Sequence, residues 1–419
     1  MTEEAVAGAP AATTATTKPK PFASLEYRDF RLLFVSSTLS STGTMMRSTA
    51  NAWQVYKLTD NPALLGLTFL FQGLPSIVVG LFGGTLADIL PQRLIMRTSM
   101  LLELGLTIIL AVLSLSGHIH VWHIYVLTLG SSVLGSIKGP ASTSLIGVLV
   151  PQRLLLNASA LQSTGWQSAF LAGPLLAGTL IDGVGPGWAY VVNGCMLAPA
   201  FVAVSMMTVG NARRPGKVRI NAPALFEGLR FAMATRVLMA FVLLDTVTMV
   251  LGYYPAMMPV FAKDILHVGG LGLGALLAAA PAGSLLGLVV VLALGQVEWK
   301  GRLILVVTIL HGGVLVAFAF STWFGLSLVL IALLGLLDSM SVSVRQTSFQ
   351  LLAKDENRGR VVGLVGIFAG AGNSLGGAYL GLAAKLMGPR TALAMGGALG
   401  SMFCLYVAAF WPRVRRFRA

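Results

Sequence analysis

The sequence contains few charged residues, two cysteines and none of the motifs of the common enzyme classes. Asp, Glu, Lys and Arg make up 11% of its 419 residues, whereas soluble domains carry about a quarter. Cys195 and Cys404 lie inside apolar runs, where small buried thiols are ordinary, so they indicate neither a disulfide nor a metal site. There is no Gly-x-x-x-x-Gly-Lys phosphate loop and no Ser-His-Asp, Cys-His or paired-carboxylate arrangement. We therefore expect no enzymatic activity, no cofactor and no direct use of ATP.

Apolar residues are abundant, at 56% of the chain with a mean hydropathy of +0.81. They fall into stretches near the roughly 20 residues that cross a bilayer, separated by segments that carry charges. We predict an all-α membrane protein with twelve transmembrane helices in two pseudo-symmetric six-helix bundles. The expected spans are 31–56, 63–85, 94–115, 122–148, 158–181, 187–209, 237–260, 270–295, 303–320, 324–346, 360–384 and 389–411.

The formal charge of +14 raises the possibility of nucleic-acid binding. The basic residues sit in short connectors and in the C-terminal tail without an aromatic-interleaved basic face, so we expect no nucleic-acid partner. Of the Lys and Arg residues outside the spans, 22 fall on the side of the N-terminus and four on the other. Because these residues are retained inside the cell, we expect both termini in the cytoplasm and the protein in a bacterial inner membrane.

Five segments are predicted along the chain. Residues 1–21 lack periodicity and the apolar core of a signal peptide, and we expect a disordered cytoplasmic tail. Residues 22–209 and 237–411 form the two bundles, and a linker at 210–236 contains an amphipathic helix on the membrane surface. Residues 412–419 form a basic cytoplasmic tail. Short stretches of the first bundle resemble stretches of the second at a common offset of a little over 200 residues. This common offset indicates that the two bundles are an internal repeat.

One charged motif joins the second and third spans on the expected cytoplasmic side. Gly84 allows close helix approach, and Asp88 with Arg93 can form a charged latch that breaks when the bundles move. The alternative is an ordinary inside loop with one fixed charge. At these three positions the sequence resembles the major facilitator superfamily, whose signature in this loop ends in basic residues. The sequence departs from that signature at Ile89, Pro91 and Gln92. We therefore assign the latch role only to the three matching positions.

The resemblance is more specific toward the branch of enterobactin-type siderophore exporters and macrolide efflux permeases. It implies a small-molecule substrate and a central cavity lined by spans 1, 4, 7 and 10. The matching pieces are Tyr27-Arg-Asp-Phe-Arg31, Gly43-Thr-Met-Met-Arg47, Trp53-Gln-Val-Tyr-Lys-Leu-Thr59, Glu227-Gly-Leu-Arg230, Pro259-Val-Phe-Ala-Lys263 and Arg358-Gly-Arg-Val361.

A glycine and proline element occurs in the fifth span. Gly173, Pro174 and Gly178 resemble the Gly-Pro-x-x-Gly-Gly element of drug:proton antiporters, with Ala177 in place of one glycine. Small residues permit tight helix crossing, and proline removes a backbone donor. Simple helix packing is the alternative, so the element favours export without establishing it.

Six ions lie inside the predicted spans, where each costs roughly 2.5 to 3.5 kcal/mol on insertion scales. We interpret Arg47 and Lys138 as cavity residues that attract an anionic or polar substrate, and Asp245, Asp338 and Glu103 as candidate proton carriers. Arg345 lies near the cytoplasmic end, where its side chain can reach the interface. The alternative for the set is structural pairing, for example of Arg47 with Asp245.

Amides and aromatic rings near these ions offer polar handles and stacking surfaces to a large ligand. The candidates are Gln54, Gln72, Trp166, Tyr253 and Asn373. Aromatic residues at span ends are alternatively interface anchors. His118, His120 and His123 share one outer loop, but no Cys or carboxylate accompanies them and we expect no metal.

Together these features predict a monomeric secondary transporter that exports an amphiphilic small molecule, of drug or siderophore type, in exchange for protons. Import, or movement of a lipid-like substrate, stays open as an alternative within the same fold. A membrane sensor or assembly factor without net transport is the alternative of another class, against which the number of intramembrane ions argues.

Overall fold

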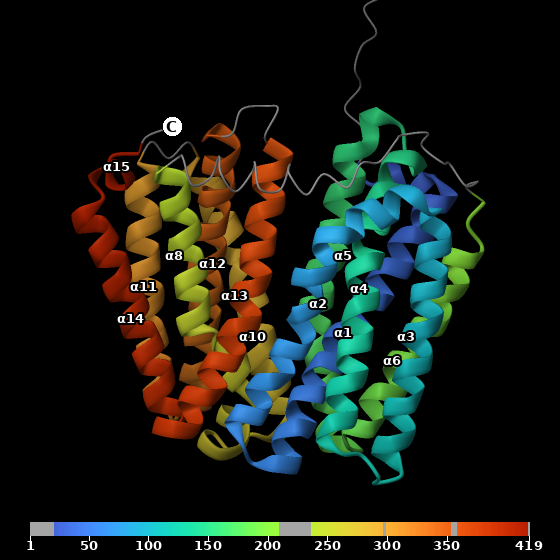
Figure 1. Cartoon of the computed structure of the whole chain (residues 1–419), viewed down its shortest axis with the longest axis horizontal. Coiled ribbons are helices and arrows are strands. Elements are labelled where there is room, and N and C mark those ends of the chain that lie inside the picture. The colour runs from blue at the N-terminus through green and yellow to red at the C-terminus, as the bar shows by residue number, and fades with distance from the viewer. Residues whose placement is uncertain (1–20, 209–235, 296–298, 353–357, 418–419) are drawn as a thin grey trace, which may run out of the picture.

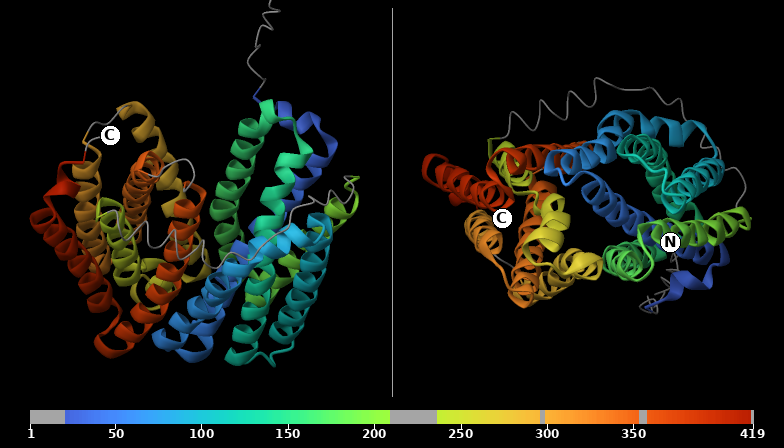
Figure 2. Two further views of the ribbon diagram at one scale, coloured as in Figure 1. Left: turned by 45° about the horizontal axis from the view of Figure 1, so that its top comes forward. Right: turned by 90° about the horizontal axis from the view of Figure 1, so that it is seen from below.

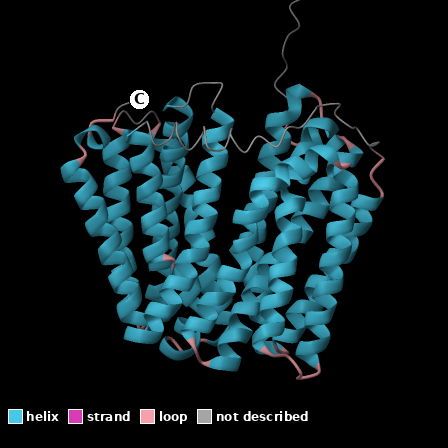
Figure 3. Ribbon diagram, viewed as in Figure 1, coloured by secondary structure: helices cyan, strands magenta, loops and turns pink. Residues whose placement is uncertain are grey.

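A computed structural model describes residues 21–208, 236–295, 299–352 and 358–417, and these residues are helical apart from short turns and connectors (Figure 3). The predicted N-terminal tail, the amphipathic helix in the linker and the last two residues of the C-terminal tail lie outside the described residues. Within the described ranges the all-α prediction is confirmed.

Two groups of long helices follow each other along the chain (Figure 1). The first group comprises α1 (Arg28–Thr59), α2 (Pro62–Ile89), α3 (Gln92–Leu115), α4 (Val121–Leu149), α5 (Leu155–Gly183) and α6 (Pro186–Ser205), with the short helices η1 (Ala23–Glu26) and η2 (Gln152–Leu154). The second comprises α8 (Arg236–Gly252), α10 (Gly269–Leu294), α11 (Lys300–Phe320), α12 (Phe324–Leu352), α13 (Arg358–Met387) and α14 (Pro389–Phe410), with the short α9 (Met258–Val260), η3 (Tyr254–Met257), η4 (Phe261–Ile265) and α15 (Pro412–Arg415).

Seven helical segments among the described residues are long and apolar enough to cross a membrane by length and composition. The remaining long helices include α1, α4 and α5, which carry runs of Ser, Thr and amide residues that lower their hydropathy. The total of twelve spans therefore stays a prediction. Large apolar side chains are exposed along the outer faces of α3 and α10, including Leu102, Val112, Leu286, Val289 and Leu292. An outer surface of this kind matches a hydrocarbon solvent.

The two groups approach each other at the edge opposite the C-terminus and spread apart at the other edge (Figures 1 and 2). The contacts that join them are α2 with α13 and α5 with α10. We call the edge at which the groups meet the closed edge. It contains the C-terminal ends of α1 and α5 and the N-terminal ends of α2 and α10.

Glycines make both crossings possible. A Cβ on Gly66 of α2 would lie 2.6 Å from the carbonyl oxygen of Gly377 in α13, and a Cβ on Gly381 would lie 2.5 Å from that of Pro62. At the second crossing, a Cβ on Gly274 of α10 would lie 2.5 Å from the Pro174 carbonyl oxygen. Larger residues at these positions would therefore force the two groups apart.

Polar contacts complete the closed edge. The Asp182 carboxylate of the first group accepts the backbone N–H groups of Gly270 and Leu271, at 2.6 and 2.7 Å, at the start of α10. A carboxylate at this position satisfies free donors and complements the helix dipole. Lys263 forms an ion pair with Asp60, and the Tyr56 hydroxyl donates to Asp264. All of these contacts connect one helix group to the other.

Candidate functional site

Three cavities follow one another from the first helix group into the second. The hydroxyl-lined cavity, of about 880 Å³, lies mainly among α1, α4 and α5 of the first group. The central cavity, of about 710 Å³, takes its lining from both groups. The acidic pocket, of about 250 Å³, lies mainly among α8, α11 and α12. Ser48, Gln72, Trp166 and Gln167 line both the hydroxyl-lined and the central cavity, so these two cavities adjoin.

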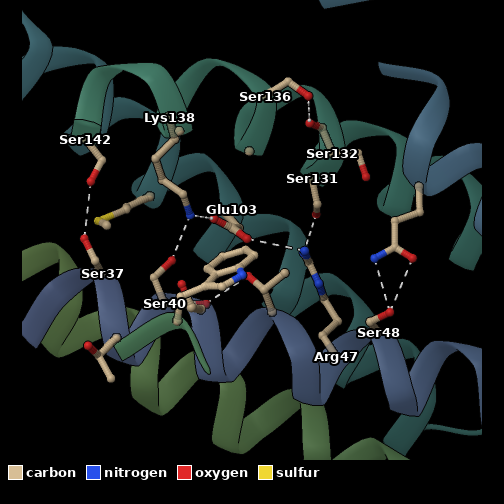
Figure 4. Close-up of a pocket in the computed structure, with 18 of the residues that line it drawn as sticks. Ser37, Ser40, Arg47, Ser48, Glu103, Ser131, Ser132, Ser136, Lys138 and Ser142 are labelled. Carbon is tan, nitrogen blue, oxygen red and sulfur yellow. Dashed lines mark hydrogen bonds and ion pairs between the residues drawn. The ribbon is translucent and has the colours of Figure 1, made fainter. Parts of the chain in front are cut away.

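The hydroxyl-lined cavity is built from polar stripes on two helices. Along α1, Ser37, Ser41, Thr44, Ser48 and Asn51 recur every three or four residues, which places them on one face. Along α4, a stripe from Thr128 to Ser142 has the same spacing and lines the same cavity. Figure 4 shows the serines of the two helices on opposite sides of the ions. From Ser37 to Asn51 the cavity follows α1 for about 20 Å, at 1.5 Å per residue.

An ion triad lies within this cavity and joins three helices. Glu103 of α3 is 2% exposed and lies between two cations, 3.3 Å from a guanidinium nitrogen of Arg47 on α1 and 2.6 Å from Lys138 Nζ on α4. Arg47 also donates to the Ser131 hydroxyl, and Lys138 donates to Ser40 at 2.8 Å (Figure 4). The triad carries one net positive formal charge. The two ion pairs hold the Arg47 and Lys138 side chains in place, and the net charge makes this wall of the cavity cationic.

The central cavity has a different chemistry. Phe69, Trp166, Phe170, Tyr253 and Tyr254 line it, and Ser or Thr account for four of its 25 lining residues. Phe69 and Tyr253, which come from different helix groups, meet edge to face with ring centroids 5.7 Å apart. Rings of this kind provide flat apolar surfaces for a ligand. The two adjoining cavities therefore offer a polar part and an aromatic part to a ligand.

The acidic pocket contains a second set of ions. Asp245 of α8 lies 2.6 Å from a guanidinium nitrogen of Arg345 on α12, and both side chains are largely buried. Asp338, two turns before Arg345 on α12, lines this pocket and the central cavity. Asp338 forms no ion pair with any residue in the described part of the chain. His311 of α11 also lines the pocket.

The structure brings most of the predicted ligand-binding residues to these cavities. Arg47 and Lys138 line the hydroxyl-lined cavity, Gln72 and Trp166 line it and the central cavity, and Tyr253 and Asn373 line the central cavity and the acidic pocket. Gln54 lines none of the three. Its amide nitrogen donates to Ser114 at 2.7 Å, and its oxygen accepts from the Tyr190 hydroxyl at 2.8 Å.

The predicted proton carriers have three different surroundings. Glu103 is held in the triad, Asp245 is paired with Arg345, and Asp338 has no paired cation in the described residues. The considered pairing of Arg47 with Asp245 is wrong. Arg47 pairs with Glu103 of α3 and Asp245 pairs with Arg345 of α12, so each of these two ions has its partner within its own helix group.

The predicted motif residues lie at helix contacts. A Cβ on Gly173 would lie 2.6 Å from Met45 Cβ of α1, and one on Gly178 would meet Gly270 of α10, while Pro174 lines the central cavity. Arg93 donates to the carbonyl oxygens of Val204 and Ser205, at 3.3 and 2.5 Å, near the C-terminal end of α6. Gly84 and Asp88 fall within α2, but the surroundings of Gly84 and the side chain of Asp88 are outside the described part of the structure, so the latch stays a prediction.

Sequence reasoning overlooked several residues of the site. The Ser and Thr stripes on α1 and α4 appear in the sequence as polar residues at helical spacing inside apolar runs, a signal that the assignment of these runs as spans does not use. His311, a lone histidine in an apolar run, was a similar signal. Asp182 sits at a span end, and nothing in its local sequence indicates that it contacts α10.

Comparison with protein families identifies the chain over nearly its whole length. A family model described as "Transmembrane secretion effector" matches residues 19–419. The "Multidrug efflux pump Tap" of Mycolicibacterium fortuitum is 25% identical over 395 residues, which cover 92% of this chain and 96% of that protein. The "Enterobactin exporter EntS" of Salmonella choleraesuis is 24% identical over 395 residues, which cover 93% of this chain and 94% of that protein.

Solved structures share the fold at low sequence identity. A peptide transporter, POT, superposes with a TM-score of 0.75 at 13% identity and covers 93% of this chain and 95% of its own. The nucleoside transporter NupG superposes with a TM-score of 0.72 at 12% identity and covers 91% of this chain and 100% of its own. A bacterial homologue of the human lysosomal transporter Spinster gives 0.70 at 16% identity, with coverage of 93% and 97%.

Proposed function

Because the chain belongs to the transmembrane secretion effector family of the major facilitator superfamily, we propose that it exports an amphiphilic small molecule in exchange for protons. The observation that carries this proposal is that a polar, cationic cavity adjoins an aromatic one and shares lining residues with it. A ligand that spans both must have a polar end and an apolar body. The relatives named as a multidrug efflux pump and an enterobactin exporter support the outward direction.

Asp338 is the proton carrier that the geometry favours. Glu103 lies between two cations and Asp245 lies against Arg345, so proton binding at either carboxylate would break a buried ion pair. Asp338 faces the central cavity without such a pair among the described residues, where substrate and proton can compete for it directly. Competition of this kind is what exchange requires, because the site must hold one or the other.

The closed edge provides the element that changes between two states. With both termini in the cytoplasm, the edge at which the helix groups separate faces inward, and the Asp182 and Lys263 contacts close the outer side. Outward opening then requires these contacts to break and the groups to meet at the other edge. We place the protein as a monomer in a bacterial inner membrane, in accord with the distribution of Lys and Arg.

An accumulation screen tests the direction of transport. The gene is expressed in a strain that lacks its own exporters, and cellular content of a panel of drugs and siderophores is measured with and without a protonophore. Export predicts lower content of at least one compound on expression, and restored content with the protonophore. Raised content on expression would establish import instead. No change across the panel, with the protein present in the membrane, would contradict the proposed function.

A further inference from the structure

The hydroxyl-lined cavity differs from the central cavity in the kind of polar atom it presents. Fourteen of its 27 lining residues are Ser or Thr, against four of 25 in the central cavity. A hydroxyl both donates and accepts a hydrogen bond, whereas the Arg47 and Lys138 side chains only donate. A wall of this composition can satisfy a partner that itself donates and accepts at many closely spaced points.

Some of these polar groups have no hydrogen-bond partner among the residues that the structure describes. Asn51 and Thr68 are 2% and 3% exposed, and both line the cavity, yet Asn51 Oδ1 and Thr68 Oγ1 form no hydrogen bond with any of those residues. The Oε1 atom of Gln162, at the same wall, is also without a partner. The amide nitrogen of Asn51 donates to Thr128 at 2.9 Å, which leaves the amide oxygen as the free end. Buried polar atoms of this kind cost stability until a ligand or water pairs with them.

The unpartnered atoms narrow the chemistry of the ligand. A carboxylate or phosphate group would bind the two cations but could offer no donor to the amide oxygens of Asn51 and Gln162. An alkyl ammonium group would supply donors but would face the net positive charge of the triad. A cluster of hydroxyl groups supplies donors and acceptors together and carries no positive charge.

We propose, on the basis of the proposed export function, that this cavity binds the polyhydroxylated head of the substrate, while the apolar body lies in the central cavity. The head is a set of neighbouring hydroxyls on an otherwise apolar molecule. Aliphatic sugar hydroxyls and neighbouring phenolic hydroxyls share this chemistry. Ser48, Gln72, Trp166 and Gln167, which line both cavities, would contact the junction between head and body.

Two pairs of fluorescent coumarins distinguish sugar hydroxyls from neighbouring phenolic hydroxyls as the head group that binds. Methylumbelliferyl glucoside is compared with the methyl ether of methylumbelliferone for the sugar, and esculetin is compared with its dimethyl ether for the neighbouring phenols. Binding of each compound to the full-length protein in lipid nanodiscs is measured by titration. The hydroxylated member of at least one pair is expected to bind about tenfold tighter than its partner, which corresponds to one or two net hydrogen bonds.

Serine variants locate the preference in the cavity. The hydroxyls of Ser41 and Ser132 line it and form no hydrogen bond within the described residues, so the double variant Ser41→Ala, Ser132→Ala keeps the fold and removes free groups. It should lower the preference to about threefold or less. Asn51→Leu should act in the same direction. Ser36→Ala is the matched control, because the Ser36 hydroxyl is buried on α1, is not among the groups that line the cavity, and donates to the Ala200 carbonyl at 2.9 Å.

The outcomes distinguish this inference from the function on which it rests. Equal binding within both pairs, tighter binding of the methyl ether or the dimethyl ether, or an undiminished preference in the Ser41→Ala, Ser132→Ala variant would overturn the head-group assignment. Proton-driven flux of these coumarins in proteoliposomes is then measured separately. Flux without a hydroxyl preference would leave export standing. A preference in binding that the double variant abolishes would support the assignment, even where absent flux contradicts export.

Discussion

Replacing Glu103 by glutamine would leave Arg47 and Lys138 as two uncompensated cations beside a buried amide. At an effective dielectric constant of about 20, unit charges at the observed separations of 2.6 and 3.3 Å attract each other by about 6 and 5 kcal/mol before desolvation is counted. Desolvation offsets much of this attraction. Removing one partner of a buried pair destabilises proteins by about 3–5 kcal/mol, and we expect Glu103→Gln to fall in this range.

The free energy of unfolding is measured by reversible denaturant titration in mixed micelles. Adding Lys138→Met to Glu103→Gln removes one of the stranded cations, so the double variant should recover roughly half of the loss. Glu26→Gln is the control, because Glu26 is exposed in η1, and it should change stability by less than about 0.5 kcal/mol. A loss below about 1 kcal/mol for Glu103→Gln, or a double variant no more stable than the single one, would refute the triad as a structural unit.

Three further predictions concern the helix contacts. Gly381→Leu should open the closed edge because the leucine side chain would meet the Pro62 carbonyl. A single cysteine placed at Gln72 in a cysteine-free background should then react with an impermeant thiol reagent added outside. Gly105→Leu is the control, because the space around Gly105 is open, and it should not change this labelling. Asp182→Ala should raise the same labelling by roughly fivefold or more, since it removes two charge-assisted hydrogen bonds worth about 1–2 kcal/mol at the start of α10, and unchanged labelling would show that the contact does not hold the edge. Arg93→Met should speed hydrogen exchange in the last turn of α6 and cost about 1–2 kcal/mol, whereas Arg97→Met, at an exposed position on the same helix, should do neither.

Hydropathy and charge predicted the fold class because the solvent imposes them directly. Spans must be apolar and helical to satisfy their backbone in lipid, and every approximate span boundary reflects that requirement. The ions inside the spans were equally visible, because each is costly there, and all six of those singled out line a cavity. The spans and the ions inside them can therefore be predicted from the sequence alone, because the lipid around each helix constrains both.

Pairings between helices could not be predicted in the same way. Glu103 meets Arg47 and Lys138 only because α3 packs beside α4 and near α1, and periodicity does not specify which helices become neighbours. Gln54 looked like a cavity amide on the same helix as Arg47, yet it points to Ser114 and Tyr190. The contact of Asp182 with α10 depends on how the two helix groups meet, which no local pattern records.

Proton-coupled flux measured in proteoliposomes tests the central claim most directly. The purified protein is reconstituted, a pH gradient is imposed, and movement of a compound identified by the accumulation screen is followed together with internal pH. Wild-type protein should accumulate the compound against its gradient while protons move the opposite way. Asp338→Asn should still exchange the compound between the two sides but lose accumulation driven by protons. Accumulation by Asp338→Asn equal to that of the wild type would contradict the account.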